Sequence, residues 1–176
     1  MAEERTISRK TVYQGRAVRV RVDVVLTPEG RETTREIVEH PDCVAIIALD
    51  DQDNVLLVKQ FRKAIEKELL EIPAGGIDAG ESPEQAVQRE MREETGYLPH
   101  QVERLGGFYS TPGYCTEYLY LYLVSDLVPS PLSAEDTAGI SLVRVSAKEV
   151  RGVIKSGKIE DAKSIAGLLF YLDSRK

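Results

Sequence analysis

Tryptophan is absent from this 176-residue sequence, and cysteine and histidine each occur only twice. The two cysteines, Cys43 and Cys115, lie far apart in the chain, so a zinc site is not expected and we interpret both as core or near-core thiols. Because tryptophan is missing, a ligand ring could stack only on tyrosine or phenylalanine, such as Tyr13, or on the plane of an arginine.

Basic residues are also in deficit. The chain has 23 Lys and Arg against 29 Asp and Glu, which gives a net charge of −6. A nucleic acid is therefore not expected as the main partner, because recognition of its phosphates needs a basic surface. A small anionic ligand is still compatible with this charge, since a bound metal can reverse the local sign of a site.

Long apolar segments are missing as well. No apolar run approaches the length of a membrane-spanning helix, and residues 1–10 are charged without the apolar core of a signal peptide. We therefore expect a cytoplasmic protein with no membrane partner. The composition, 42% hydrophobic and 30% charged, is that of an ordinary globular protein with a sizeable core.

Alternating residues in the first quarter of the chain predict strands. Valines alternate with Arg and Asp over residues 18–24, a turn is indicated at 28–30, and an extended pattern resumes at 33–39. We predict an N-terminal antiparallel hairpin or small sheet over residues 1–41, with residues 42–176 forming the main domain.

The main domain combines short apolar runs with two later helices. Residues 43–49 are continuously apolar, as in a strand buried on both faces, and pair with 55–61 in a predicted hairpin. A capping box from Ser146 to Glu149 predicts one helix to about residue 156. Further strands are predicted at 69–72, 102–110 and 117–124, and a last helix at 161–172. The class is α+β, with helices packed on a mixed sheet.

The start of another helix is well marked. Ser82 is a favoured N-cap, Pro83 suits the first helical position, and Gln85 can complete a capping box. We predict that this helix runs to about Thr95 and ends at Gly96.

Three glutamates of this helix, Glu90, Glu93 and Glu94, share one face. Like charges at this spacing destabilise a helix, so we expect compensation. Arg89 can pair with Glu93, which leaves Glu90 and Glu94 to converge on one point. Carboxylate oxygens favour Mg²⁺ or Mn²⁺. Taken alone, the same residues also fit a solvated acidic face.

The residues that frame this helix favour the metal site. The fixed positions are Gly75, Glu81, Arg89, Glu90, Glu93, Glu94 and Gly96. Their spacing over residues 75–97 resembles the Nudix box, and only Tyr97 departs, where an aliphatic residue is more common. The resemblance implies the Nudix fold, an α/β/α sandwich around a mixed sheet, to which the N-terminal sheet is an addition.

The resemblance also implies a metal site and a reaction. Glu90 and Glu94 would be the main Mg²⁺ ligands, with Mn²⁺ as a substitute, and the Ala74 carbonyl would be a further ligand. Glu93 would lie at or next to the metal as a catalytic group. Bound cations neutralise a diphosphate and lower the pKa of an attacking water, and a carboxylate can complete its deprotonation.

The remaining box residues would hold the frame. By the same resemblance, Arg89 and Glu81 orient the glutamates and the loop, with Arg89 acting on the catalytic group through its pair with Glu93. Gly75 and Gly96 would be needed for backbone geometry.

Segments outside the box resemble the ADP-ribose pyrophosphatase subgroup. They are residues 35–40, 59–62, 71–75 and 161–164, together with Pro112, sixteen residues after Gly96. The implied reaction converts ADP-ribose and water to AMP and ribose 5-phosphate. The implied assembly is a homodimer in which the N-terminal sheet reaches across to the partner.

The same resemblance suggests substrate contacts. Arg62 would contact the diphosphate, Arg35 and Glu36 would lie near the adenine, and Gly113 and Glu117 would line the ribose end. The alternatives are a surface arginine at a strand edge for Arg62, and ordinary exposed strand positions for Arg35 and Glu36.

The loop at residues 133–140 departs from the subgroup, since Ala138 stands where a glutamate is common. Either Glu135 or Asp136 supplies a catalytic carboxylate, or Glu93 alone positions the water. This departure leaves room for a broader nucleoside diphosphate sugar pyrophosphatase.

Two further functions are less favoured. A nucleoside triphosphate pyrophosphohydrolase is disfavoured by the N-terminal sheet and Pro112. A catalytically weak ADP-ribose-binding sensor is disfavoured because the box retains all its glutamates.

Overall fold

The computed structural model describes residues 3–134, 137 and 139–175. It divides into two compact units. The N-terminal unit ends at Asp42 and also includes the segment Tyr109–Tyr118, and the second unit comprises Cys43–Phe108 and Leu119–Lys176. The segment from Tyr109 therefore belongs with the N-terminal sheet, although it lies within the residues we assigned to the main domain.

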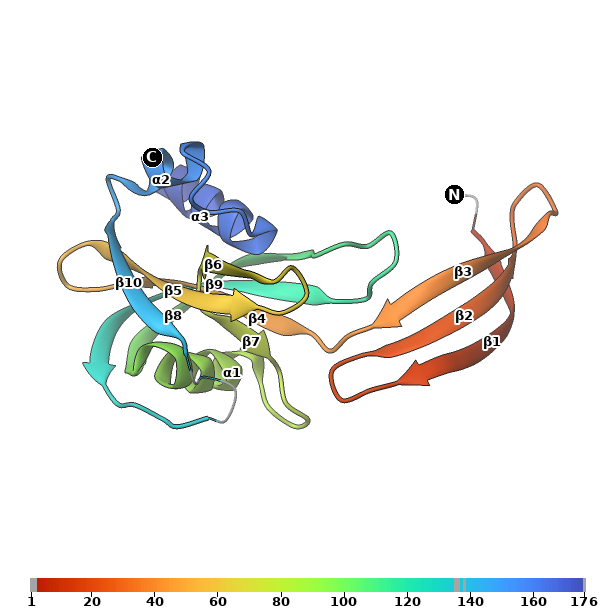
Figure 1. Cartoon of the computed structure of the whole chain (residues 1–176), viewed down its shortest axis with the longest axis horizontal. Coiled ribbons are helices and arrows are strands. Elements are labelled where there is room, and N and C mark those ends of the chain that lie inside the picture. The colour runs from red at the N-terminus through yellow and green to blue at the C-terminus, as the bar shows by residue number, and fades with distance from the viewer. Residues whose placement is uncertain (1–2, 135–136, 138, 176) are drawn as a thin grey trace. The chain divides into compact units, whose positions relative to one another are not determined.

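The N-terminal unit is a sheet of three antiparallel strands (Figure 1). The central strand β2 (Arg19–Leu26) pairs on one side with β1 (Arg5–Gln14) and on the other with β3 (Glu32–Glu39). β1 was not predicted as a separate strand. Every residue of β1 is exposed, so the strand lacks the alternation of buried and exposed positions that identifies β2.

The second unit contains a mixed sheet of seven strands. The central strand β4 pairs parallel with β9 and antiparallel with β5 and β7, while β10 and β6 pair antiparallel with β5 and β8 is the edge strand beside β9. The strands are β4 (Cys43–Leu49), β5 (Asn54–Arg62), β6 (Lys67–Glu71), β7 (Ala74–Gly76), β8 (Tyr97–Tyr109), β9 (Tyr118–Pro129) and β10 (Ser141–Ser146).

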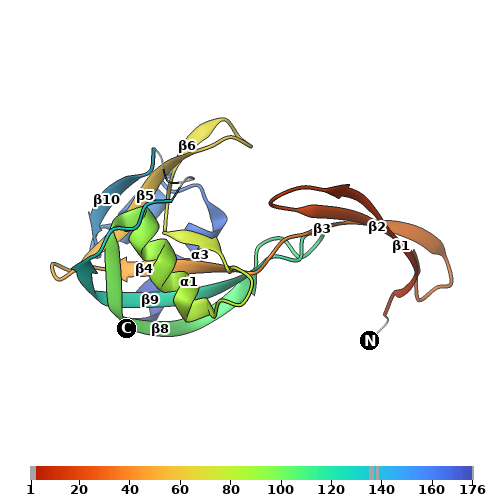
Figure 2. The same cartoon turned by 90° about the horizontal axis from the view of Figure 1, so that it is seen from below.

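Helices cover both faces of this sheet (Figures 1 and 2). α1 (Pro83–Glu90) lies on one face, and α2 (Val150–Lys155) and α3 (Ala162–Ser174) lie on the other. β4 supplies side chains to both layers: Val44 packs in the cluster that includes α1 residues, and Ala45 packs in the cluster that includes α3 residues. The unit is thus the expected α/β/α sandwich, and its central strand is buried on both faces.

One helix prediction needs correction. The capping box at Ser146 is not formed, because Ser146 ends β10 and only its backbone carbonyl accepts a bond, from the Glu149 N–H at 2.8 Å. α2 therefore begins at Val150, after a turn, and its N-cap makes no side-chain hydrogen bond. α3 starts as predicted, with the Asp161 side chain accepting from the Ser164 N–H. In the part of the chain that the structure describes, no helix is both long and apolar enough to span a membrane.

Candidate active site

The box helix begins as its sequence predicts. The Ser82 hydroxyl accepts from the Gln85 N–H at 3.2 Å, and the Gln85 amide oxygen accepts from the Ser82 N–H at 2.8 Å, which completes the capping box. The helix widens after Glu90: residues Met91–Thr95 form a π-helical turn. Such turns change the angular spacing of side chains and recur at functional sites.

The turn ends at Gly96, as predicted. The Gly96 N–H donates to the Met91 carbonyl, and Gly96 adopts a φ of 80°, in the left-handed region that favours glycine. Gly75 is required for a different reason from the one predicted. Its φ is not positive, but a Cβ at this position would overlap the carboxylate of Glu90.

Arg89 is the centre of a hydrogen-bond network with three carboxylates. Its guanidinium donates to both carboxylate oxygens of Glu81, at 3.0 and 2.9 Å, and to Glu90 at 2.6 Å. It reaches the expected partner Glu93 at 3.2 Å and also donates to the Gly76 carbonyl at 2.7 Å. Arg89 therefore ties the loop before the helix to two of the three helix glutamates, which is more than the single pair that the spacing predicted.

Glu94 is bonded to the backbone and not to Arg89. Its carboxylate accepts from the backbone N–H of Ala74 at 3.0 Å. Burial, followed by repulsion from Glu90, raises the pKa of Glu94 to about 8. Burial also raises the pKa of Glu90, against the lowering influence of Arg89. Both carboxylates are thus held where the charged form is costly unless a cation joins them.

The backbone of Ala74 is oriented towards the same place. The Ile46 N–H donates to the Pro73 carbonyl at 2.9 Å, which marks these two residues as a hydrogen-bonded pair of the antiparallel ladder. Ala45 and Ala74 are the next pair along, so the peptide groups of Ala74 face away from β4. The Ala74 carbonyl is therefore on the same side as its N–H, which bonds Glu94.

These donors fit a hard divalent cation. The carboxylates of Glu81, Glu90 and Glu93 all bond the guanidinium of Arg89, and Glu94 adds a fourth carboxylate. The negative charge of these four carboxylates therefore exceeds the single positive charge of Arg89 that contacts them. The donor atoms are all oxygens, which suits Mg²⁺ or Mn²⁺.

Arg62 ends β5, in the same unit as this cluster. Its guanidinium makes a two-point contact with Glu71, at 2.8 and 2.7 Å, and 41% of its side chain remains exposed. Sequence reasoning gave no role to Glu71, nor to Lys163, which also bonds Glu71. The available signals were the segments 71–75 and 161–164, which resemble the subgroup and contain these two residues, but neither segment indicates that Glu71 and Lys163 meet.

The other predicted contacts lie elsewhere. Gly113, Glu117, Arg35 and Glu36 belong to the N-terminal unit. Arg35 and Glu36 are successive residues of β3 and so point to opposite faces of the sheet. Arg35 pairs with Glu4.

Glu36 lines a different feature, an apolar hollow formed with Val20, Val22, Val38 and Tyr114. A carboxylate oxygen of Glu117 lies 3.6 Å from Nδ1 of His40. The predicted catalytic alternatives Glu135 and Asp136 lie outside the described residues.

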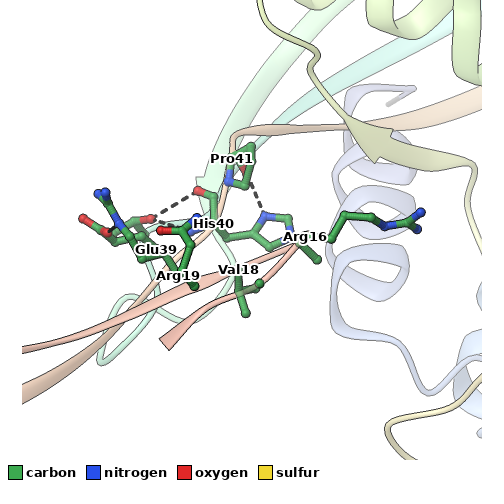
Figure 3. A pocket seen from close by; sticks show the side chains of 10 residues that line it. Arg16, Val18, Arg19, Glu39, His40 and Pro41 are labelled. Atoms are coloured by element: carbon green, nitrogen blue, oxygen red, sulfur yellow. Dashed lines mark hydrogen bonds and ion pairs between the residues drawn. The ribbon is translucent and has the colours of Figure 1, made fainter. Parts of the chain in front are cut away.

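A hollow of about 350 Å³ with a mixed polar and apolar lining occurs within the N-terminal unit (Figure 3). His40 lines it with its Nδ1 2.7 Å from the Pro41 carbonyl, and Arg19 and Glu39 form an ion pair at its edge. Because Arg19 and Glu39 neutralise each other, this hollow does not show the carboxylate excess that marks the box.

Comparison with known proteins gives concordant results. The family model of the NUDIX domain matches residues 39–168. An ADP-ribose pyrophosphatase of Bacillus subtilis is 33% identical over 164 residues, which cover 92% of this chain and 89% of that protein. An ADP-ribose pyrophosphatase of Mycobacterium tuberculosis is 36% identical over 167 residues, with 93% and 81% covered.

Two further similarities add to these. A methanol dehydrogenase activator of Bacillus methanolicus is 36% identical over 170 residues, covering 96% of this chain and 92% of that protein. The crystal structure of an ADP compounds hydrolase superposes with a TM-score of 0.89 at 21% identity, covering 97% of this chain and 93% of that one, which supports the fold. The arrangement of the box residues, the sandwich fold and these matches together show that the chain belongs to the Nudix family.

Proposed function

We propose that this protein hydrolyses the diphosphate bond of ADP-ribose to AMP and ribose 5-phosphate, using Mg²⁺. The observation that carries the proposal is the cluster of Glu81, Glu90 and Glu93 on Arg89, with Glu94 held against Ala74. The excess of buried carboxylate charge calls for divalent cations, and a diphosphate is the substrate class that such cations activate. The ADP-ribose pyrophosphatases among the relatives support the choice of substrate.

The chain's own residues divide the work. Glu90, Glu94 and the Ala74 carbonyl would hold Mg²⁺, which neutralises the diphosphate and lowers the pKa of an attacking water. Arg89 fixes the carboxylates of Glu90 and Glu93, so their orientation is set before substrate binds. We assign Glu93, which is only partly buried, to accept the proton of the water, alone or with Glu135 or Asp136.

We further propose that the protein is a homodimer assembled through the N-terminal sheet. This sheet exposes the large apolar side chains of Ile7, Val12 and Tyr13, and Tyr114 of the same unit is exposed as well, with about half or more of each surface accessible. An apolar hollow of about 420 Å³ opens on the same sheet. Exposed apolar surface of this kind marks interaction sites, and a second copy would cover it.

A substrate panel tests the specificity. With Mg²⁺ present, kcat/KM is measured for ADP-ribose, UDP-sugars and GDP-sugars. We expect ADP-ribose to be preferred; equal or faster turnover of the other sugars would replace the proposal with a broader nucleoside diphosphate sugar pyrophosphatase.

The substitution Glu94→Gln separates an enzyme from an ADP-ribose-binding sensor. It removes the charge of a metal ligand but keeps the shape of the side chain. We expect Mg²⁺-dependent turnover to fall by about two orders of magnitude or more. The matched control is Glu103→Gln on the exposed side of β8, which should leave the rate unchanged. Equal rates for wild type and Glu94→Gln would reject the metal-dependent mechanism.

A further inference from the structure

Glu71 is a charged residue in an unusual position. It ends β6, and only 1% of its surface is accessible. Burial would raise the pKa of this carboxyl, but hydrogen bonds and charge from Arg62 and Lys163 outweigh burial and hold the pKa below its ordinary value. Glu71 is therefore a buried anion that depends on two cations from distant parts of the chain.

The two cations approach Glu71 from different elements. Arg62, at the end of β5, uses Nε and Nη2 for its two-point contact and so leaves Nη1 for another acceptor. Lys163, in the first turn of α3, donates to Glu71 and also to Asp161 at 3.0 Å. The ammonium group of Lys163 has three N–H donors. Among the residues that the structure describes, Glu71 and Asp161 accept two hydrogen bonds from it, which leaves one N–H for another acceptor.

The start of α3 is fixed to the strand that leads into the box. The Ser164 hydroxyl accepts from the Ile72 N–H at 2.9 Å, and Ser164 is fully buried. Two residues after Ile72, the Ala74 N–H donates to Glu94. The segment from Ile72 to Ala74 is thus hydrogen-bonded to α3 at its start and to the proposed metal ligand Glu94 at its end.

Arg62 and Lys163 meet the same short segment of chain that contacts Glu94. Both cations bond Glu71, which is three residues before Ala74, and the Ala74 N–H bonds the Glu94 carboxylate. The two cations therefore lie close to a proposed metal ligand, and both keep part of their side chains accessible, 41% for Arg62 and 15% for Lys163.

We propose that Lys163 is a second cationic contact for the substrate diphosphate beside Arg62, and that the buried Glu71 is the positioning residue that aims both cations at it. This inference rests on the proposed function, since it assumes a diphosphate next to Glu94. Mg²⁺ held by the box would neutralise part of the charge of a diphosphate. Arg62 and Lys163 would donate hydrogen bonds to its oxygens and add positive charge.

Stability alone does not account for the cluster. Replacing a buried ion pair or triad by apolar side chains is often neutral or stabilising, because removing charges from water is costly. A preorganised pair of cations is useful where an anion must bind, since their orientation costs no further reorganisation in the complex.

The test compares lysines that join the same two parts of the chain. Lys163→Met removes the proposed contact, and Lys163→Arg restores a cation. The control is Lys67→Met: Lys67 lies on β6 and pairs with Glu160, just before α3, but both side chains are about half exposed. Glu71→Gln tests the positioning role, because the amide keeps the shape of Glu71 and removes the charge.

Two measurements are made on each full-length variant. The first is the kinetics of ADP-ribose hydrolysis at saturating Mg²⁺. The second is calorimetric binding of methylenediphosphonate, a non-hydrolysable diphosphate, with Mg²⁺ present. We expect Lys163→Met to raise KM and weaken diphosphonate binding by about tenfold each, while kcat changes less. Lys163→Arg should recover most of the KM and most of the diphosphonate affinity of wild type. Glu71→Gln should raise KM, whereas Lys67→Met should match wild type.

The outcomes separate this inference from the proposed function. If wild type does not hydrolyse ADP-ribose but Lys163→Met still loses diphosphonate binding, the substrate assignment fails and the cationic subsite stands. If ADP-ribose is hydrolysed and Lys163→Met leaves KM and diphosphonate binding within twofold of wild type, Lys163 is structural and the inference is overturned. Absence of diphosphonate binding to wild type overturns it as well.

Discussion

The two units of this protein bury their strands to opposite extents. In β4 of the Nudix unit, six of the seven residues are buried, and successive side chains pack in separate apolar clusters. In β1 of the N-terminal sheet, all ten residues are exposed. Helices cover β4 on both faces of its sheet, whereas β1 is an edge strand of a three-stranded sheet.

This difference teaches what each unit can do within one chain. A site that holds carboxylates against their mutual repulsion needs rigid support, and the Nudix unit supplies it through its two-sided core. The N-terminal sheet is held by ladder pairing and by ion pairs such as Arg21 with Glu39 at 2.7 Å. Its exposed apolar side chains are better suited to contact a partner than to form a core.

The largest expected effect comes from the tightest point of the Nudix unit. Gly75→Ala places a methyl group where the Glu90 carboxylate lies, so a metal ligand must move. We expect kcat/KM for ADP-ribose to fall by about a hundredfold, since small misplacement of a catalytic group is costly. The matched control is Gly76→Ala, which meets no atom within 4 Å and should retain activity. Comparable losses in both variants would mean that the strand, and not the contact with Glu90, is sensitive.

A second change tests the contrast in burial directly. Ile47→Ala empties a fully buried position of β4, and we expect it to lower the free energy of unfolding by about 2–5 kcal/mol. The paired change Val12→Ala, at a β1 residue that is 53% exposed in the single chain, should cost less than about 0.5 kcal/mol at protein concentrations below those at which the proposed dimer forms. Chemical denaturation of both variants measures the difference. Similar losses would show that the N-terminal sheet is as tightly packed as the Nudix core.

The same contrast explains what could be predicted from the sequence. Local signals with one physical cause were reliable: Ser82 and Gln85 specified a helix start, and the apolar run of β4 specified a strand buried on both faces. β1 was missed because an exposed strand carries no periodic burial pattern. The capping box at Ser146 was wrong because ladder pairing with β5 used that residue to end a strand.

The site was predictable to a similar degree. The spacing of the glutamates singled out Glu90 and Glu94, whose role as metal ligands stays a prediction. The structure adds the contacts of Arg89 with Glu81 and Glu90, where spacing alone predicted one pair with Glu93. Glu71 and Lys163 were not found, because they are 92 residues apart and only tertiary packing brings them together. Gly75 was noted for the wrong reason, since a steric overlap with a side chain cannot be seen in a local sequence pattern.

A third change tests whether a second copy covers the N-terminal sheet. Tyr13→Lys places a charge at an exposed aromatic position of β1, 58% accessible in the single chain. If this sheet forms the proposed dimer interface, the dimer should dissociate about tenfold more readily, because a buried charge without a partner is costly. Ile65→Lys, at a 57% exposed position of the Nudix unit, is the control and should leave assembly unchanged. Sedimentation equilibrium gives the dimer dissociation constant of each variant. Equal constants for Tyr13→Lys and wild type would exclude this sheet as the interface.

The smallest expected effect is a pH dependence confined to the Nudix unit. The pKa of Glu94 is raised to about 8 in the folded, metal-free protein, above the ordinary value of 4.5. A carboxyl with a raised pKa contributes its full stability below the unfolded value of 4.5. This contribution is lost as the pH rises from 4.5 through the folded value of about 8. The Tm of the metal-free protein should therefore fall by a few degrees more over this range in wild type than in Glu94→Gln, which cannot ionise. Mg²⁺ should reduce the fall in wild type by binding the ionised carboxylate, so parallel curves for the two metal-free proteins would show that Glu94 is not the titrating group.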